Sequence, residues 1–250
     1  MLSLPLILSI YTLSFLVGTV FLAIIVAIKG LLKLSAFKPS KTNLDNLLYF
    51  FKEHYVYSKW VVAAGILFWS YSQGIFIMAD LIGVSELGIA KVRSIQNLLG
   101  LFTILLVSME SFFIPVFSRN VATLSKAVQG FYSKYALIIA GVFILSIPVF
   151  YLVYDIFYQE KYGSGILILS IFWISQLVVV FLRPLSMALK AKEVSYPLFL
   201  AHLMALICLI SLGTLFMYLW EDIGMSLGLF LAYLSSNITI LYFYKKHIKE

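Results

Sequence analysis

Cysteine, histidine and charged residues are scarce in this chain, and each scarcity excludes a class of site. Cys208 is the single cysteine among 250 residues, so neither an intrachain disulfide nor a cluster of thiolate metal ligands can form. Only three histidines are present, and no glycine-rich phosphate loop or paired histidine and carboxylate motif accompanies them. We therefore predict that the protein is not an enzyme and that it holds no metal ion and no cofactor.

Charged residues make up 12% of the chain, whereas 62% of the residues are hydrophobic and the mean hydropathy is +1.03. A water-soluble globule of this size cannot bury so many apolar side chains. A helix of about 20 apolar residues crosses a bilayer core of roughly 30 Å and satisfies its own backbone polar groups there. We predict an all-α integral membrane protein with seven transmembrane helices, at residues 4–28, 60–82, 95–117, 135–157, 165–186, 196–219 and 225–244.

The net charge of +7 is distributed in a pattern that indicates membrane orientation rather than a nucleic-acid partner, because the basic residues are spread between apolar spans. Fifteen of the 18 lysines and arginines fall in alternate connections and in the tail: Lys29, Lys33, Lys38, Lys41, Lys52, Lys59, Arg119, Lys126, Lys134, Arg183, Lys190, Lys192, Lys245, Lys246 and Lys249. The opposite connections are short and mostly acidic. The positive-inside tendency then predicts a multi-pass protein of the cell membrane with a cytoplasmic C-terminus, and the lipid bilayer is its first partner.

The chain divides into three predicted parts. Residues 1–30 form a single helix that must run from outside to inside although no basic residue precedes it, so we expect upstream helices to be missing; the alternative is a complete protein with an external N-terminus. Residues 31–59 form a basic cytoplasmic linker, and residues 60–250 form a lobe of six transmembrane helices. Apolar residues at helical spacing predict an amphipathic helix in the linker, on the membrane surface: Leu44, Leu47, Leu48, Phe51 and Tyr55.

Polar residues inside spans are the candidate site, since an ionisable group in a bilayer usually faces a partner or a water-filled cavity. Lys91 and Arg93 lie near the outer end of an extended third helix, and Asp80 ends the second. With Gln73 and Asn97 they could line a polar cleft and contact a substrate. The alternative is that Lys91 and Arg93 reach the outer interface and Asp80 forms an ion pair with one of them.

Glu110 lies near the cytoplasmic end of the third span, without a basic neighbour in the sequence. It could titrate during ion coupling, or it could pair with Arg183, which follows the fifth span at the same face. His202, inside the sixth span, has an expected role in hydrogen-bonded packing rather than as a ligand.

The order of several short motifs carries a resemblance to a known family. Asp80 ends a helix and is followed by Leu-Ile-Gly-Val-Ser-Glu-Leu-Gly at 81–88 and by Phe-Ile-Pro-Val-Phe-Ser at 113–118. Later junctions agree in order: Tyr162-Gly163, Arg183-Pro184-Leu185, Lys190-Ala191-Lys192, and Ile-Gly-Met-Ser-Leu-Gly at 223–228. Across residues 60–250 this order resembles the second helical half of polysaccharide and lipid-linked oligosaccharide flippases in the multidrug/oligosaccharidyl-lipid/polysaccharide exporter superfamily.

The resemblance implies helices six to twelve of a two-lobed transporter, with the first lobe absent and a basic linker between lobes. It further implies that the protein moves undecaprenyl-pyrophosphate-linked oligosaccharide to the outer leaflet for O-antigen, capsule or related surface polysaccharide assembly. Expected partners are the lipid-linked oligosaccharide, a missing N-terminal lobe and other polysaccharide-assembly proteins. Charge and position make Lys91 and Arg93 candidates for contacting the diphosphate.

Two other functions stay open. An ion-coupled multidrug or small-solute antiporter of the same superfamily would need a carboxylate such as Asp80 or Glu110 in its pathway. A truncated membrane subunit that does not transport is favoured by the helix count and the abrupt start.

Overall fold

The structure is a computed structural model that describes residues 41–119 and 121–249. The predicted first span at 4–28, and the linker up to residue 40, lie outside the described residues. The chain falls into two units, which divide between Lys52 and Glu53, and the second is Glu53–Glu250. Of the first unit, the described part is the beginning of one helix.

Helices account for nearly all of the described residues, and no strand occurs among them. The α-helices are α2 (Lys41–Ile82), α3 (Glu86–Leu99), α4 (Leu101–Ser118), α5 (Leu124–Tyr162), α6 (Ile166–Ala191), α7 (Tyr196–Cys208) and α8 (Thr214–Tyr244). A 3-10 turn (Val121–Thr123) precedes α5, and π-helical turns follow α7 (Leu209–Gly213) and α8 (Lys245–Lys249). The predicted all-α class is confirmed for the described part of the chain.

Two predicted boundaries differ in the structure. Helix α2 runs without a break from Lys41 to Ile82, so the amphipathic stretch and the second span are one helix instead of two. The predicted third span at 95–117 begins within α3, and α3 and α4 meet at Gly100 with a bend of 41°. No glycine or proline separates the polar part of α2 from its apolar part, so the helix continues from one into the other.

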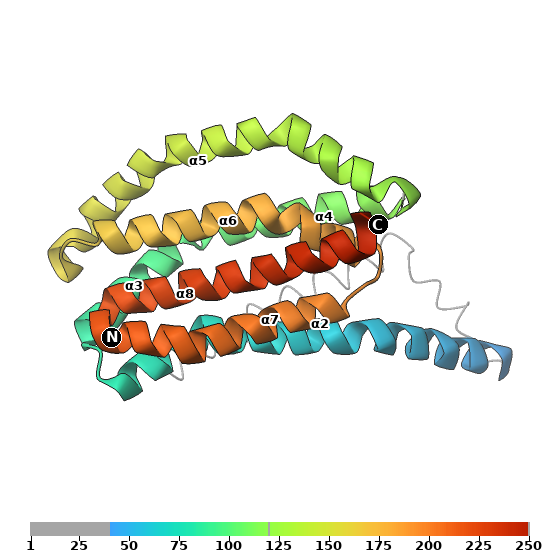
Figure 1. Cartoon of the computed structure of the whole chain (residues 1–250), viewed down its shortest axis with the longest axis horizontal. Coiled ribbons are helices and arrows are strands. Elements are labelled where there is room, and N and C mark those ends of the chain that lie inside the picture. The colour runs from blue at the N-terminus through green and yellow to red at the C-terminus, as the bar shows by residue number, and fades with distance from the viewer. Residues whose placement is uncertain (1–40, 120, 250) are drawn as a thin grey trace, which may run out of the picture. The chain divides into compact units, whose positions relative to one another are not determined.

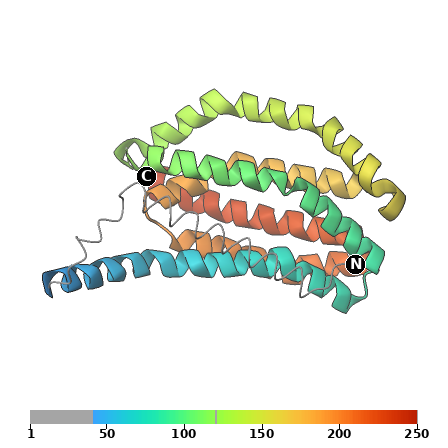
Figure 2. The ribbon, with the colours of Figure 1, turned by 180° about the vertical axis from the view of Figure 1, so that it is seen from behind.

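Residues 196–248 form an antiparallel pair of helical arms, here called the α7–α8 hairpin. The helical path breaks at Trp220 and Glu221, where Glu221 has φ +46°, and the two arms lie side by side in both views (Figures 1 and 2). A straight helix of this length would measure about 80 Å, far more than a bilayer core. Two close backbone approaches hold the arms together, Gly213 against Gly228 and Phe216 against Gly224. Such contacts between small residues are typical of helices packed in lipid.

Four helical stretches in the described residues are long and apolar enough to cross a membrane, and a fifth if the bent pair α3 and α4 counts as one span. The four are His54–Ile82, Val121–Tyr162, Ile166–Ala191 and Tyr196–Ile248. Their outward side chains are apolar, as on α5, where Leu137 is 87% and Leu145 75% exposed. Exposing so many apolar side chains to water is unfavourable, so this surface is suited to contact with lipid.

Two clusters of buried apolar side chains occupy opposite ends of the bundle. One includes Val92, Phe102, Phe143 and Trp173 and joins α2, α3, α4, α5, α6 and the hairpin. The other lies where α4, α6 and α8 end and α5 begins. Figure 1 shows that α5 arches away from α6 in the middle of its length.

Candidate functional site

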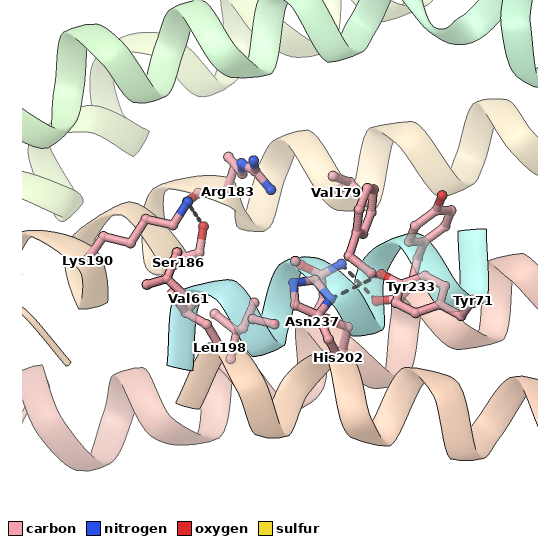
Figure 3. A pocket seen from close by; sticks show the side chains of 15 residues that line it. Val61, Tyr71, Val179, Arg183, Ser186, Lys190, Leu198, His202, Tyr233 and Asn237 are labelled. Atoms are coloured by element: carbon pink, nitrogen blue, oxygen red, sulfur yellow. Dashed lines mark hydrogen bonds between the residues drawn. The ribbon is translucent and has the colours of Figure 1, made fainter. Parts of the chain in front are cut away.

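A polar cavity of about 270 Å³ lies between α2, α6 and the two arms of the hairpin (Figure 3). Its position is the junction of the two apolar clusters: Ala205 and Ala232 on the hairpin belong to one cluster, and Ala201 and Ile240 to the other. The polar or aromatic lining residues are Phe68, Tyr71, Arg183, Ser186, Lys190, His202, Tyr233, Ser236 and Asn237. A polar cavity inside an apolar bundle is the usual form of a binding site or transport path in a membrane protein.

One side of the cavity carries neutral hydrogen-bonding groups. The Tyr71 hydroxyl and Nδ1 of His202 are 3.2 Å apart in a hydrogen bond that joins α2 to α7. Asn237 Nδ2 donates to the Tyr233 carbonyl at 2.8 Å, and both residues lie beside His202 in Figure 3. His202 thus has the hydrogen-bonded packing role that we predicted, and it also faces the cavity.

The other side of the cavity is cationic. Arg183 and Lys190 both line it and both contact Glu110 of α4: Arg183 Nε lies 2.8 Å from Oε1, and Lys190 Nζ donates to both carboxylate oxygens at 2.8 and 2.9 Å. The Glu110 side chain is 17% exposed and the two cations 30% and 23%. Two cations against one carboxylate leave one positive charge, which a partly buried site balances most readily with an anion.

Helix α6 gathers these groups because Arg183, Ser186 and Lys190 recur at spacings of three and four residues, which places them on one helical face. Ser186 donates to the Arg183 carbonyl at 2.8 Å, so its hydroxyl is satisfied within the helix. Pro184, which is buried next to Arg183, removes one backbone donor from α6 at this point.

A second and wider hollow, of about 810 Å³, opens at the end of the bundle where α6 ends and α7 begins. It is lined by His54, Val56, Tyr57 and Trp60 of α2 and by Glu193, Val194, Ser195 and Tyr196 of the α6–α7 turn. Lys190 lines both hollows. Lys190 therefore lies where the cavity and the wider hollow meet.

The structure separates the candidates predicted near the opposite end. Lys91 pairs with Asp222 of the hairpin, with Nζ 2.9 Å from Oδ2, and not with Asp80. Asp80 and Arg93 line one open recess, yet within residues 41–119 and 121–249 no ion pair joins them, and the Arg93 guanidinium lies over the Phe76 ring at 5.3 Å.

Gln73 and Asn97 line neither this recess nor the polar cavity. Gln73 is half-buried and Asn97 is exposed. The structure therefore brings Asp80 and Arg93 to one recess, while the wider cleft that includes Gln73 and Asn97 stays a prediction.

Sequence reasoning proposed Glu110 and Arg183 as a pair but missed Lys190 and the neutral side of the cavity. The predicted fifth span ended at Ser186, so Lys190 was counted with the connection, whereas α6 continues to Ala191. Lys190 is seven residues, or two helical turns, from Arg183, and this spacing could have predicted that the two side chains share one face of the helix. Tyr71 and Asn237 gave no local signal, because each joins the cavity through long-range packing.

Long apolar helices, an apolar exterior and an internal polar cavity together define a multi-pass helical membrane protein. A scan against protein-family models, a search of curated proteins and a search of solved structures found no match to this chain.

Proposed function

We propose that the protein moves an undecaprenyl-pyrophosphate-linked oligosaccharide across the cytoplasmic membrane for surface polysaccharide assembly. The observation that carries this proposal is the cationic side of the polar cavity, where Arg183 and Lys190 outnumber Glu110. A diphosphate and its sugars cannot cross hydrocarbon unaided, so a carrier must offer a polar path with a positive charge. The resemblance of residues 60–250 to lipid-linked oligosaccharide flippases supports the same conclusion.

The proposed topology has seven crossings. The predicted span at 4–28 supplies the first, α2 the second, and the bent pair α3 and α4 the third. Helices α5 and α6 supply two more, and the arms of the α7–α8 hairpin the last two, because the break at Glu221 turns the chain back. This path brings the ends of α4, α6 and α8 and the start of α5 to one face, which we assign to the cytoplasm from its lysines and arginines.

The wider hollow at this face gives the proposal a direction. A headgroup arriving from the cytoplasm would meet His54, Tyr57 and Trp60 before it reached Lys190 and then Arg183. Hydroxyl, amide and imidazole groups at Tyr71, His202 and Asn237 would then be available to sugar hydroxyls. We propose that a complementary lobe, upstream in the same protein or on another chain, closes the other side of this path.

An antiporter is the second candidate, and it is favoured by Glu110, the carboxylate that contacts Arg183 and Lys190 of the cavity lining. The excess of cations there fits an anionic cargo better than a cationic drug, because a drug cation would be repelled by the remaining positive charge.

A flipping assay tests the proposal. The full chain is reconstituted in liposomes with a fluorescent undecaprenyl-pyrophosphate-linked oligosaccharide, and dithionite quenching reports the fraction that changes leaflet. We expect movement well above that of protein-free liposomes, and a loss of about tenfold or more in the Arg183→Gln/Lys190→Gln variant, because charge-assisted contacts to phosphate are among the strongest in proteins.

Two controls sharpen the assay. A Lys245→Gln/Lys246→Gln variant changes the same number of charges on exposed residues outside the cavity and should flip at the wild-type rate. Equal rates for the cavity variant and the wild type, or equal movement of a fluorescent phosphatidylcholine, would contradict the proposal.

A further inference from the structure

An apolar groove of about 230 Å³ lies between α4 and α5, on the outside of the bundle and apart from the polar cavity. It is lined by Met109, Phe113, Phe131, Tyr135, Ile138, Ile139, Val142 and Phe143. The α5 side chains in the groove are open to the exterior, with Ile138 59% and Val142 51% exposed. In a membrane such a groove contains lipid chains, since neither water nor a polar ligand is stable there.

Aromatic side chains that contact one another line one end of the groove. The Phe113 and Phe131 rings meet edge to face with centroids 4.9 Å apart, and Tyr135 lies 5.2 Å from Phe131. This end is nearest to the connection between α4 and α5, because Phe113 lies near the end of α4 and Phe131 near the start of α5. A chain in the groove would therefore have its headgroup at this connection.

The connection and the first turns of α5 carry positive charge with no acidic residue among them. Arg119, Lys126 and Lys134 are all exposed, and residues 111–154 contain no aspartate or glutamate. The Lys134 ammonium lies over the Tyr135 ring, 5.3 Å from its centroid, so one cation is placed directly at the groove. No ion pair of these three cations occurs within the described parts of the chain.

We infer that the α4–α5 groove is a binding site for an anionic phospholipid, with one acyl chain along Phe113, Ile138 and Val142 and the headgroup phosphate at Lys134, Lys126 and Arg119. Basic pockets between helices at a membrane surface select anionic headgroups in this way. The bound lipid supplies both an anion for these cations and apolar contacts for the exposed side chains of the groove. The inference does not rest on the proposed transport of a lipid-linked sugar.

Native mass spectrometry of the full, delipidated chain tests this site. Phosphatidylglycerol or phosphatidylcholine of the same chain length is titrated in detergent, and the dissociation constant of the first bound lipid is measured. We expect the wild type to bind phosphatidylglycerol more tightly than phosphatidylcholine. Replacing Arg119, Lys126 and Lys134 together with glutamine should reduce the affinity for phosphatidylglycerol roughly a hundredfold, at about fivefold for each cation. If the triple variant is too unstable to purify, the single variant Lys134→Gln, at an exposed residue, is measured instead. Its affinity for phosphatidylglycerol should be about fivefold weaker than that of the wild type.

Matched variants separate charge from packing. Val142→Trp fills the groove and should weaken the first site for both lipids, whereas Leu145→Trp, on the same helix but outside the groove, should change neither. Neutralising Lys192, Lys245 and Lys246, three exposed cations elsewhere, should leave the preference intact. Equal affinity for the two lipids in the wild type, or an equal loss in this second triple variant, would overturn the inference. Arg183→Gln should not affect lipid binding, so the groove and the transport proposal fail or stand separately.

Discussion

Replacing Glu110 with glutamine is expected to destabilise the bundle more than replacing either of its cationic partners. The substitution leaves Arg183 and Lys190 facing each other without an anion, in a site where the Glu110 side chain is only 17% exposed. Removing one partner of a buried ion pair costs about 3–5 kcal/mol, because the remaining charge is desolvated and unpaired. Lys190→Gln should cost clearly less, since Glu110 keeps Arg183 as its partner.

Chemical unfolding in detergent micelles measures this order. The double variant Glu110→Gln/Lys190→Gln supplies the decisive comparison, because it removes one of the two cations left unpaired and should be more stable than Glu110→Gln alone. Additive losses in the double variant would mean that the two side chains do not interact, contrary to the structure.

The pairing of Glu110 illustrates how far the sequence alone could go. Apolar runs and alternating charge were sufficient to predict a helical membrane protein and to place Glu110 and Arg183 at one end of it. They could not decide between pairing and titration, because that depends on how α4 and α6 pack, and the two side chains are 73 positions apart in the sequence. Lys190 was missed for a local reason, the length of α6.

At the other end of the bundle, the partner of Lys91 also could not be predicted from the sequence. Asp80 is close to Lys91 along the chain, and sequence reasoning joined neighbours across one short turn. The structure joins Lys91 to Asp222, 131 residues away, because the turn of the hairpin lies against the start of α3. The turn of the hairpin was easier to predict, because Glu221 and Asp222 interrupt the apolar run between the predicted spans at 196–219 and 225–244, where the helix breaks.

Replacing Gly224 with alanine is expected to disrupt the α7–α8 hairpin, the second large effect. A Cβ at Gly224 would overlap the Phe216 carbonyl on the opposite arm, and backbone atoms cannot move aside as a flexible side chain can. Overpacking typically costs 1–3 kcal/mol, and we expect about 3 kcal/mol or more here because the clash is with backbone. The measurement is the thermal midpoint in detergent, together with the yield of monodisperse protein.

Gly74→Ala is the matched control for this prediction. Gly74 lies within α2, and a Cβ added there would meet no atom within 4 Å, so alanine should be neutral or stabilise the helix by up to about 1 kcal/mol. A Gly224→Ala variant as stable as Gly74→Ala would mean that the two arms do not approach at Phe216.

The most direct test of the account is whether the cavity is open to water and positively charged. Ser186 lines the cavity between Arg183 and Lys190, whereas Ser175, on the same helix, is equally buried but lies outside the lining. Each is changed to cysteine in a Cys208→Ser background, and the rates of modification by an anionic and a cationic methanethiosulfonate are measured from each side of the membrane. We predict that the Ser186→Cys thiol reacts from the side that bears Lys192 and the Lys245 tail, faster with the anionic reagent, while the Ser175→Cys thiol reacts with neither. A faster reaction with the cationic reagent, or no reaction at Ser186→Cys, would contradict the account.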